Sequence, residues 1–325
     1  MVAKEKIANL PTKIEKLERY FEKAGKNIYI KRDDLTGIEF SGNKVRKLEY
    51  SFNEGLKDGA EIFITCGGIQ SNHARAVAAL ATKLGKKSIL LLRSDEKNPS
   101  LDGNYFLDKI LGAEIRLVST EEFSSSRDMI MENIKKEMEE KGKKAYIIPL
   151  GASNGIGVFG YRNCLREILE QEKELGIEFD TIVTAVGSGG TYAGLFLENK
   201  IKKLDKKIVG VNVSDTAEYF KDVILELIQE NIKYTGENVE VERNEIEIID
   251  GYVGRGYALN TKEELGFLEE FAKVEGVVLD PVYTGKAMFG MKKELNLKLK
   301  NSKNILFVHT GGLFGIFPKI KEFDM

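Results

Sequence analysis

The chain has 325 residues, of which 42% are hydrophobic and 31% charged, enough for about two domains with ordinary globular cores. Its 49 Lys and Arg nearly balance its 51 Asp and Glu, and a net charge of -2 excludes a dedicated nucleic-acid binder, which needs a basic excess. Two cysteines and two histidines allow neither a disulfide framework nor a three-histidine zinc site, so we expect no metal centre.

The same features predict a protein of the reducing cytoplasm without a membrane partner. Residues 1–26 carry Lys and Glu throughout, which predicts no signal peptide. No apolar run reaches the length that a bilayer requires, because the longest candidate, 305–318, is interrupted by His309 and three glycines.

Predicted strands and helices alternate along the chain. An edge strand with a turn is predicted over 29–35, and a helix starts at the segment 42–44. Further strands are predicted at 61–65, 88–93, 114–118, 145–148, 181–186, 207–213 and 304–309, and helices at 71–84, 127–141, 158–175, 191–204, 216–232 and 261–274. These strands are apolar on both faces, as in a parallel sheet. The sequence therefore predicts an α/β fold with open, mostly parallel twisted sheets flanked by helices, and ligands at the carboxyl ends of the strands.

Glycine-rich turns follow four of the predicted strands, at 67–68, 151–155, 187–190 and 311–312. Glycine lacks the Cβ that keeps a ligand away from the backbone. One such turn is routine packing, but four in one chain predict that several backbones approach one ligand closely.

The turn at 187–194 follows a strand and opens a helix. It departs from the dinucleotide fingerprint, because Tyr192 stands where G-x-G-x-x-G requires its third glycine. Its N–H groups at a helix N-terminus still suit one phosphate group. A glycine-rich turn without a ligand is the alternative.

The segment 151–155 matches the nucleophile elbow G-x-S-x-G of serine hydrolases. Ser153 would be the nucleophile, and His309 lies downstream in the order that such enzymes use. Small residues after a strand also produce this pattern by chance. A serine hydrolase is therefore an alternative from another enzyme class.

Lys44 stands at the start of the helix that Gly42 opens. A lysine there is usually solvated surface; the alternative is a Schiff-base lysine whose neutral amine is favoured by burial and neighbouring cations. His73, His309 and Tyr283 have equally plain interpretations, as a helix-start residue, a core histidine and a turn aromatic. None of these residues indicates a function alone.

Several segments taken in order resemble one family. They are IKRDDLT at 30–36, SGNKVRKLE at 41–49, GGIQSNH at 67–73, PLGASN at 149–154, DPVYTGK at 280–286 and HTGG at 309–312. They resemble the D-cysteine desulfhydrase/1-aminocyclopropane-1-carboxylate deaminase family of pyridoxal-phosphate enzymes, of the tryptophan-synthase-β fold type (fold type II). The resemblance implies two domains with the cofactor in the cleft between them, a large domain of residues 1–47 and 156–325 and a small domain of residues 48–155. It also implies a homodimer.

The resemblance implies that Lys44 holds pyridoxal phosphate and then takes a proton from the substrate Cα. Lys47 matches a residue near the phosphate, which would sit on the backbone of the turn that begins at Gly187. Asn72 would hydrogen-bond the ring oxygen, and Thr310 would lie beside the ring nitrogen. The implied cofactor-binding residues are Lys44, Lys47, Asn72, Gly187, Ser188, Gly189, Gly190, Thr191, Thr284 and Thr310.

For the substrate, the resemblance implies that Ser71, Asn72 and His73 hold the carboxylate, whose charge suits a helix N-terminus. The implied catalytic residues are Lys44, Ser71, Tyr257 and Tyr283. A threonine hydroxyl beside the ring nitrogen makes the ring a weaker electron sink than a carboxylate would, which suits prompt expulsion of a β-leaving group.

Thr284 discriminates between activities within the family. The cyclopropane-opening deaminases carry glutamate after the tyrosine, where this chain has threonine. Opening a ring without a Cα–H needs additional acid–base help, so the missing carboxylate speaks against that reaction. We therefore expect a lyase that converts D-cysteine and water into sulfide, pyruvate and ammonia.

Alternatives remain within this chemistry and outside it. Within it are 1-aminocyclopropane-1-carboxylate deaminase, L-cysteate sulfo-lyase and L-cysteine desulfhydrase activity. Outside it are the hydrolase that would use Ser153 and His309, and a non-catalytic amino-acid-binding protein of the same fold. The expected partner is a small amino-acid substrate, and neither nucleic acid nor a membrane.

Overall fold

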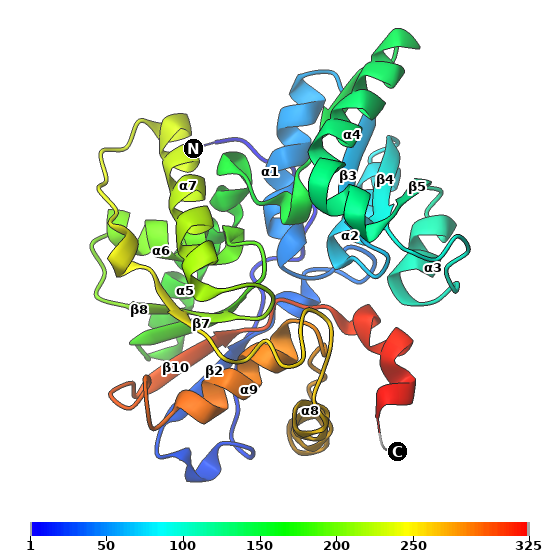
Figure 1. The fold of residues 1–325 in the computed structure, drawn as a ribbon. Helices are drawn as coiled ribbons and strands as arrows, with labels where there is room; N and C mark the ends of the chain where they lie inside the picture. The colour runs from blue at the N-terminus through cyan, green and yellow to red at the C-terminus, as the bar shows by residue number, and fades with distance from the viewer. Residues whose placement is uncertain (1, 324–325) are drawn as a thin grey trace.

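A computed structural model describes residues 2–323 and folds them around two sheets flanked by helices (Figure 1). The larger sheet is mostly parallel, because β1 alone runs antiparallel to its neighbour. In spatial order its strands are β1 (Ile14–Lys16), β2 (Asn27–Lys31), β10 (Asn304–Val308), β7 (Thr181–Val186), β8 (Lys207–Asn212) and β9 (Glu247–Ile249).

The smaller sheet is parallel throughout. Its order is β5 (Glu114–Val118), β4 (Lys87–Arg93), β3 (Ile62–Gly68) and β6 (Ala145–Ile147). Together the two sheets confirm the predicted α/β class with mostly parallel sheets.

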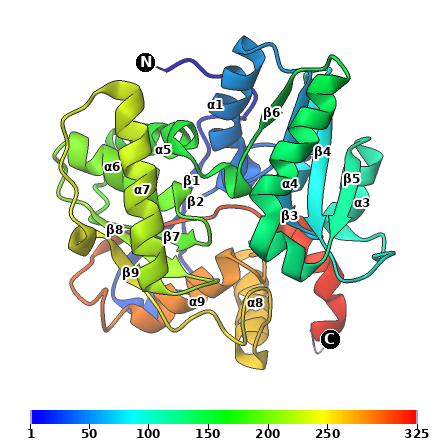
Figure 2. The ribbon, with the colours of Figure 1, turned by 45° about the horizontal axis from the view of Figure 1, so that its top comes forward.

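Helices cover both faces of each sheet. They are α1 (Asn43–Lys57), α2 (Asn72–Lys83), α3 (Gly103–Ile110), α4 (Thr120–Glu140), α5 (Gly155–Leu175), α6 (Gly190–Ile201), α7 (Ala217–Thr235), α8 (Lys262–Glu275) and α9 (Thr284–Glu294), with short 3₁₀ helices that include η3 (Leu150–Ala152) and η5 (Leu313–Glu322). In Figure 2, α7 lies over the larger sheet and α4 over the smaller one.

The central strand β10 shows how the layers form. Leu306 and Val308 pack into the core that β10 shares with α5, α6 and α7, whereas Ile305 and Phe307 pack into the core on the side of α8 and α9. Alternate side chains of a strand point to opposite faces, so a continuous apolar run is buried on both sides.

Most predicted elements agree with the observed ones to within three residues, and two differ more than that or in kind. The segment 29–35 is not an edge strand, because β1 pairs with β2 on the side opposite β10. Helix α4 begins at Thr120 rather than at residue 127, because Ser119 and Glu122 form a reciprocal capping box at its start. The elements β1, β9, α3 and α9 were not predicted.

The two sheets draw their strands from the chain segments assigned above to the two domains. The domain boundaries themselves stay a prediction, since α1 runs across residue 48 and the C-terminal η5 packs against α3. Among residues 2–323, every helix is too short or too polar to cross a membrane.

Candidate functional site

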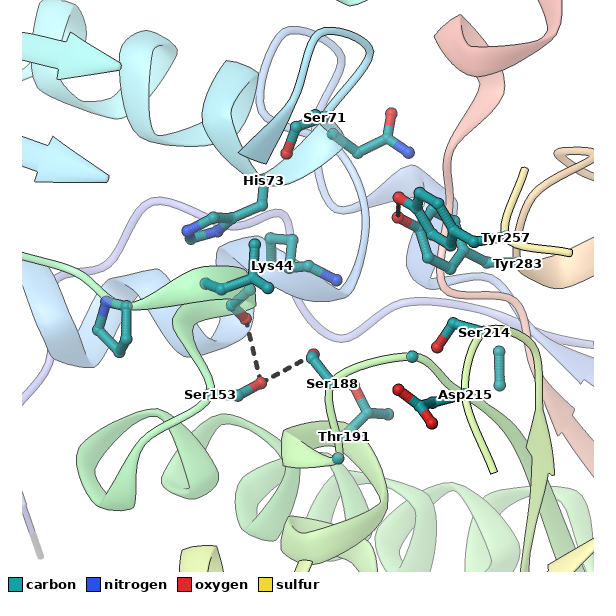
Figure 3. Close-up of a pocket in the computed structure, with 18 of the residues that line it drawn as sticks. Lys44, Ser71, His73, Ser153, Ser188, Thr191, Ser214, Asp215, Tyr257 and Tyr283 are labelled. Carbon is teal, nitrogen blue, oxygen red and sulfur yellow. Dashed lines mark hydrogen bonds between the residues drawn. The ribbon is translucent and has the colours of Figure 1, made fainter. Parts of the chain in front are cut away.

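A cavity of about 510 Å³ opens where strands of both sheets end. All four predicted glycine turns line it, through Gly68, Gly151, Gly187, Gly189 and Gly311. Figure 3 shows Lys44 in the middle of this pocket, between His73, a pair of serines and a pair of tyrosines. The volume of this cavity is typical of a site for a small organic ligand.

Lys44 reaches the pocket from the first turn of α1. The helix begins directly after Gly42, whose φ of 99° favours glycine and where a Cβ would lie 2.6 Å from the carbonyl oxygen of Thr310. The Lys44 amine donates a hydrogen bond to Asn43 Oδ1 at 3.1 Å and lies 5.9 Å from the ring centroid of Tyr283. Burial lowers the pKa of Lys44 to about 8, although the negative charge of Asp280 acts in the opposite direction. The amine therefore loses its proton more easily than an exposed lysine does.

A buried ionic network holds α1 in place behind Lys44. Arg46 donates to both carboxylate oxygens of Asp33 at 2.8 Å, and its other N–H groups reach Glu167 at 2.9 Å. Tyr161 on α5 donates to Asp33 at 2.6 Å. Burial would raise the pKa of Asp33, but the charge of Arg46 lowers it, so the carboxylate stays ionised. The network ties α1 to α5 and to the turn after β2.

The start of α6 forms a cradle for an anion. Gly189 has a φ of 80°, and the first N–H groups of α6 have no carbonyl partner within the helix. A Cβ at Gly190 would lie 2.8 Å from Ser153 Oγ and 3.3 Å from Lys47 Nζ, so glycine keeps this cradle open. Ser153 and Ser188 hydrogen-bond each other at 2.9 Å (Figure 3).

Lys47 supplies an amine to this cradle. It donates to Ser153 Oγ at 3.2 Å and to the carbonyl of Gly151. Burial and the nearby charge of Lys44 hold the pKa of Lys47 well below its usual range. An anion in the cradle would favour the protonated amine. Thr191, the second residue of α6, lines the same wall and accepts a hydrogen bond from Asn43 at 2.9 Å.

Ser71, Asn72 and His73 line the pocket at the start of α2. The Ser71 side chain caps the helix by accepting from the N–H of Ala74 at 3.1 Å. The N–H groups of Asn72 and His73 precede the first intrahelical bonds and are available to an anion. The His73 ring is buried and bonds Thr65 Oγ1 through Nε2 at 2.7 Å. Burial and the charges of two lysines lower the pKa of His73, which keeps the ring neutral.

Tyr257 and Tyr283 form a hydroxyl pair on the opposite wall, with their oxygens 2.5 Å apart. Tyr257 keeps 40% of its surface exposed, but desolvation among the pocket residues raises the pKa of both phenols, so both keep their protons at neutral pH. The N–H of Tyr283 donates to Asp280 Oδ2 at 2.9 Å, which anchors the start of α9.

The two threonines of the implied cofactor set lie in different places. Thr310 lines the pocket at the end of β10. Thr284 is fully buried and is not brought to the pocket wall: its hydroxyl donates to Asp280 Oδ1 at 2.7 Å and accepts from the N–H of Asp280 at 2.9 Å. Every other residue of the implied set lines the cavity, except Lys47 and Gly190, which stand directly behind its wall.

The structure does not bring Ser153 and His309 together. Ser153 lines the pocket, whereas His309 is buried outside it. His309 Nδ1 accepts from the N–H of Gly311 at 3.2 Å, and Nε2 lies 3.2 Å from the carbonyl oxygen of Val278. A histidine committed in this way cannot act as the base for a serine nucleophile.

Sequence reasoning missed several residues of the pocket. Arg93 lines it from the end of β4, with its guanidinium 5.8 Å from the ring centroid of Tyr257. Within the described chain this guanidinium makes no ion pair or hydrogen bond. Arg127, Asp128 and Asp215 also line the mouth. Arg93 could have been found as a charged residue at the carboxyl end of a predicted buried strand.

Comparisons with known proteins agree on one family. A family model described as "Pyridoxal-phosphate dependent enzyme" matches residues 6–311. The chain is 47% identical to a putative 1-aminocyclopropane-1-carboxylate deaminase of Thermotoga maritima over 96% of this chain and 97% of that protein. It is 41% identical to the bifunctional D-cysteine desulfhydrase/1-aminocyclopropane-1-carboxylate deaminase, mitochondrial, of Arabidopsis thaliana, over 97% of this chain and 80% of that protein. A crystal structure of an ACC deaminase homologue superposes with a TM-score of 0.90 at 39% identity, covering 98% of this chain and 94% of the other.

Proposed function

Because the chain belongs to the D-cysteine desulfhydrase/1-aminocyclopropane-1-carboxylate deaminase family of pyridoxal-phosphate dependent enzymes, we propose that it is a β-elimination lyase acting on D-cysteine. The reaction converts D-cysteine and one water into sulfide, pyruvate and ammonia. Pyridoxal phosphate is its cofactor.

The residues around the pocket fit this cofactor. The α6 cradle and the Lys47 amine suit a phosphate group, because glycine at 190 leaves room there. Within residues 2–323 the N–H groups of Thr191 and Tyr192 have no hydrogen-bond partner, so they are free to bind an anion. Burial lowers the pKa of Lys44 to about 8. Lys44 therefore suits attachment to an aldehyde, since only the neutral amine is a nucleophile. From the family resemblance we assign Asn72 to the ring oxygen and Thr310 to the ring nitrogen, and both residues line the cavity.

Bound pyridoxal phosphate supplies an electron sink that acidifies the Cα–H of an attached amino acid. Lys44 Nζ then takes the Cα proton, and its depressed pKa keeps the amine neutral enough for this role near pH 8. Arg46, two residues after Lys44 on α1, hydrogen-bonds Asp33 and Glu167. These bonds keep α1, and with it Lys44, in a fixed position relative to the substrate.

The tyrosine pair serves the leaving group. When the Cβ–S bond breaks, its electron pair stays on sulfur, and a hydroxyl of Tyr257 or Tyr283 donates a proton to that sulfur. Raised pKa values keep both phenols protonated before this step. The hydrogen bond between them allows the second phenol to stabilise the charge on the first.

The substrate carboxylate lies at the start of α2. The N–H groups of Asn72 and His73 and the Ser71 hydroxyl converge there, and the helix dipole favours an anion. Arg93 adds a positive charge, since its guanidinium lies within 4 Å of a Cβ placed at Gly68, the residue that begins this turn.

Thr284 is the observation that carries the choice of D-cysteine. Its hydroxyl donates a hydrogen bond to the Asp280 carboxylate and accepts one from the Asp280 N–H. This position therefore offers the pocket neither a carboxylate nor a free hydroxyl. The extra acid–base group expected of a cyclopropane-opening enzyme is therefore missing. A hydroxyl-only site is sufficient for β-elimination, in which the substrate has a Cα–H for Lys44 to remove.

Deamination of 1-aminocyclopropane-1-carboxylate is the second candidate, because the Thermotoga maritima relative at 47% identity carries that name. Purified holoenzyme should be assayed with D-cysteine, L-cysteine, L-cysteate and 1-aminocyclopropane-1-carboxylate, with ammonia as the common product. We expect ammonia and equimolar sulfide from D-cysteine. Ammonia from the cyclopropane amino acid alone would overturn the proposal and establish the second candidate.

Two further proposals concern the assembly of the protein and its compartment. A homodimer is proposed from the family resemblance, and size-exclusion chromatography with light scattering tests it. A reducing compartment such as the cytoplasm is proposed because Cys66 and Cys164 are both free thiols.

A further inference from the structure

Asn104 lies behind the pocket wall and holds Asn72. It is the second residue of α3, and its side chain is fully buried. Its Nδ2 donates to Asn72 Oδ1 at 3.0 Å and to the carbonyl oxygen of Gln70 at 3.0 Å. Its backbone N–H donates to Gln70 Oε1 at 2.8 Å. A residue 32 positions away in sequence therefore clamps a side chain of the pocket.

These bonds determine which end of the Asn72 amide faces the pocket. The carbonyl of Gln70 can only accept, so the nitrogen of the Asn104 amide must point towards it. The second N–H of that nitrogen then needs an acceptor, which is Asn72 Oδ1. The Asn72 oxygen is thereby turned away from the pocket, and its NH₂ group, unpaired within the described residues, is left as a donor.

We propose that Asn104 is a positioning residue that fixes Asn72 as a hydrogen-bond donor to the ring oxygen of pyridoxal phosphate. This inference rests on the proposed function, in which Asn72 contacts that oxygen. Without the clamp, the Asn72 amide can rotate or flip, and its oxygen would then face an oxygen of the ligand.

The clamp has a consequence that can be measured without substrate. A donor stabilises the ionised ring oxygen, so the bound cofactor loses its exchangeable proton at lower pH when the donor is in place. Removing the clamp should raise the midpoint of the pH-dependent change in the visible spectrum by roughly one pH unit. It should also weaken binding of pyridoxal phosphate by about tenfold.

Asp108 provides the matched control. It lies one turn further along α3 and is fully buried, and its two carboxyl oxygens have no hydrogen-bond partner within residues 2–323. Burial raises the pKa of Asp108 to about 8, so Asp108→Asn is a conservative change at neutral pH. It probes the packing of α3 without touching Asn72.

The experiment titrates the visible spectrum and measures cofactor affinity for wild type, Asn104→Ala, Asn72→Ala, the double variant and Asp108→Asn. We expect Asn104→Ala to shift in the same direction as Asn72→Ala, the double variant to shift no further than Asn72→Ala, and Asp108→Asn to match wild type. Asn104→Ser, too short to reach Asn72 but tolerated in a first helical turn, replaces Asn104→Ala if that variant does not fold.

Three outcomes would overturn the inference. They are a wild-type titration for a folded Asn104 variant, additive shifts in the double variant, and an equal shift in Asp108→Asn. A wild-type protein that shows no visible band with pyridoxal phosphate would instead overturn the proposed function itself.

Discussion

The hydroxyl oxygens of Tyr257 and Tyr283 lie 2.5 Å apart, and their rings meet edge to face with centroids separated by 6.1 Å. One phenol donates a hydrogen bond to the other, so one hydroxyl proton of the pair remains for an acceptor in the pocket. Because burial raises the pKa of both groups, this proton is present throughout the neutral range.

We predict that replacing either tyrosine by phenylalanine slows D-cysteine breakdown. Replacing the tyrosine that faces the sulfur should lower kcat about 100-fold or more, since general acids contribute about 10²–10⁴-fold. Replacing the other tyrosine should lower kcat about tenfold. Turnover of 3-chloro-D-alanine should stay close to wild type, because chloride leaves without a proton. Equal losses on the two substrates would show that the tyrosines do not serve the leaving group.

Lys47 should contribute to affinity through the phosphate alone. In Lys47→Met the charge-assisted contact is lost, and the Kd for pyridoxal phosphate should rise about 10- to 100-fold. Pyridoxal, which lacks the phosphate, should bind wild type and variant equally when binding is followed by absorbance. A similar loss for both compounds would place Lys47 elsewhere.

Thr284 should matter for stability more than for cofactor binding. Valine has the same shape but leaves the buried N–H of Asp280 without its acceptor, so Thr284→Val should lower the free energy of unfolding by about 1–3 kcal/mol in urea titrations. Thr284→Ser keeps both hydrogen bonds and serves as the control. A variant of unchanged stability that binds the cofactor more weakly would instead support a direct contact.

The pKa of Lys44 predicts how cofactor uptake by the apoprotein depends on pH. Only the neutral amine attacks an aldehyde, so the attachment rate should rise about tenfold per pH unit below the pKa of about 8 and level off above it. Stopped-flow absorbance measures this profile. Pyridoxal is the ligand to use, because it has no phosphate group whose own ionisation would add to the pH dependence. A midpoint near 10 would mean that Lys44 is solvated like an ordinary surface lysine.

Most of the fold could be predicted because its signals are local. The strands β5 and β7 have the predicted bounds. Strand β7 is β-branched or apolar and buried throughout, as a central parallel strand should be, whereas β5 is an edge strand that carries Glu114 and Arg116 and is only partly buried. The strands β1 and β9 have three residues each and exist through pairing with neighbours, which a sequence does not display. The start of α4 was predictable from the sequence, because Ser119 and Glu122 have the spacing of a capping box. This signal was missed.

The candidate site also has features that the local sequence reveals and features that only the packing of the helices creates. Glycine turns and helix starts are local, and the predicted turns at Gly68, Gly151, Gly187 and Gly311 do line one pocket. The contact of Asn104 with Asn72 depends on how α3 packs against α2, and no local pattern reveals it. The burial of the Thr284 hydroxyl against Asp280 was hidden for the same reason, since the motif shows the residue but not its orientation.

The attachment point of the cofactor tests the account most directly. Holoenzyme reduced with borohydride and digested should yield one peptide that carries the pyridoxyl group on Lys44, and Lys44→Ala should remain folded, carry no such label and release no sulfide from D-cysteine. A label on another lysine, or an unlabelled Lys44 in active enzyme, would contradict the account.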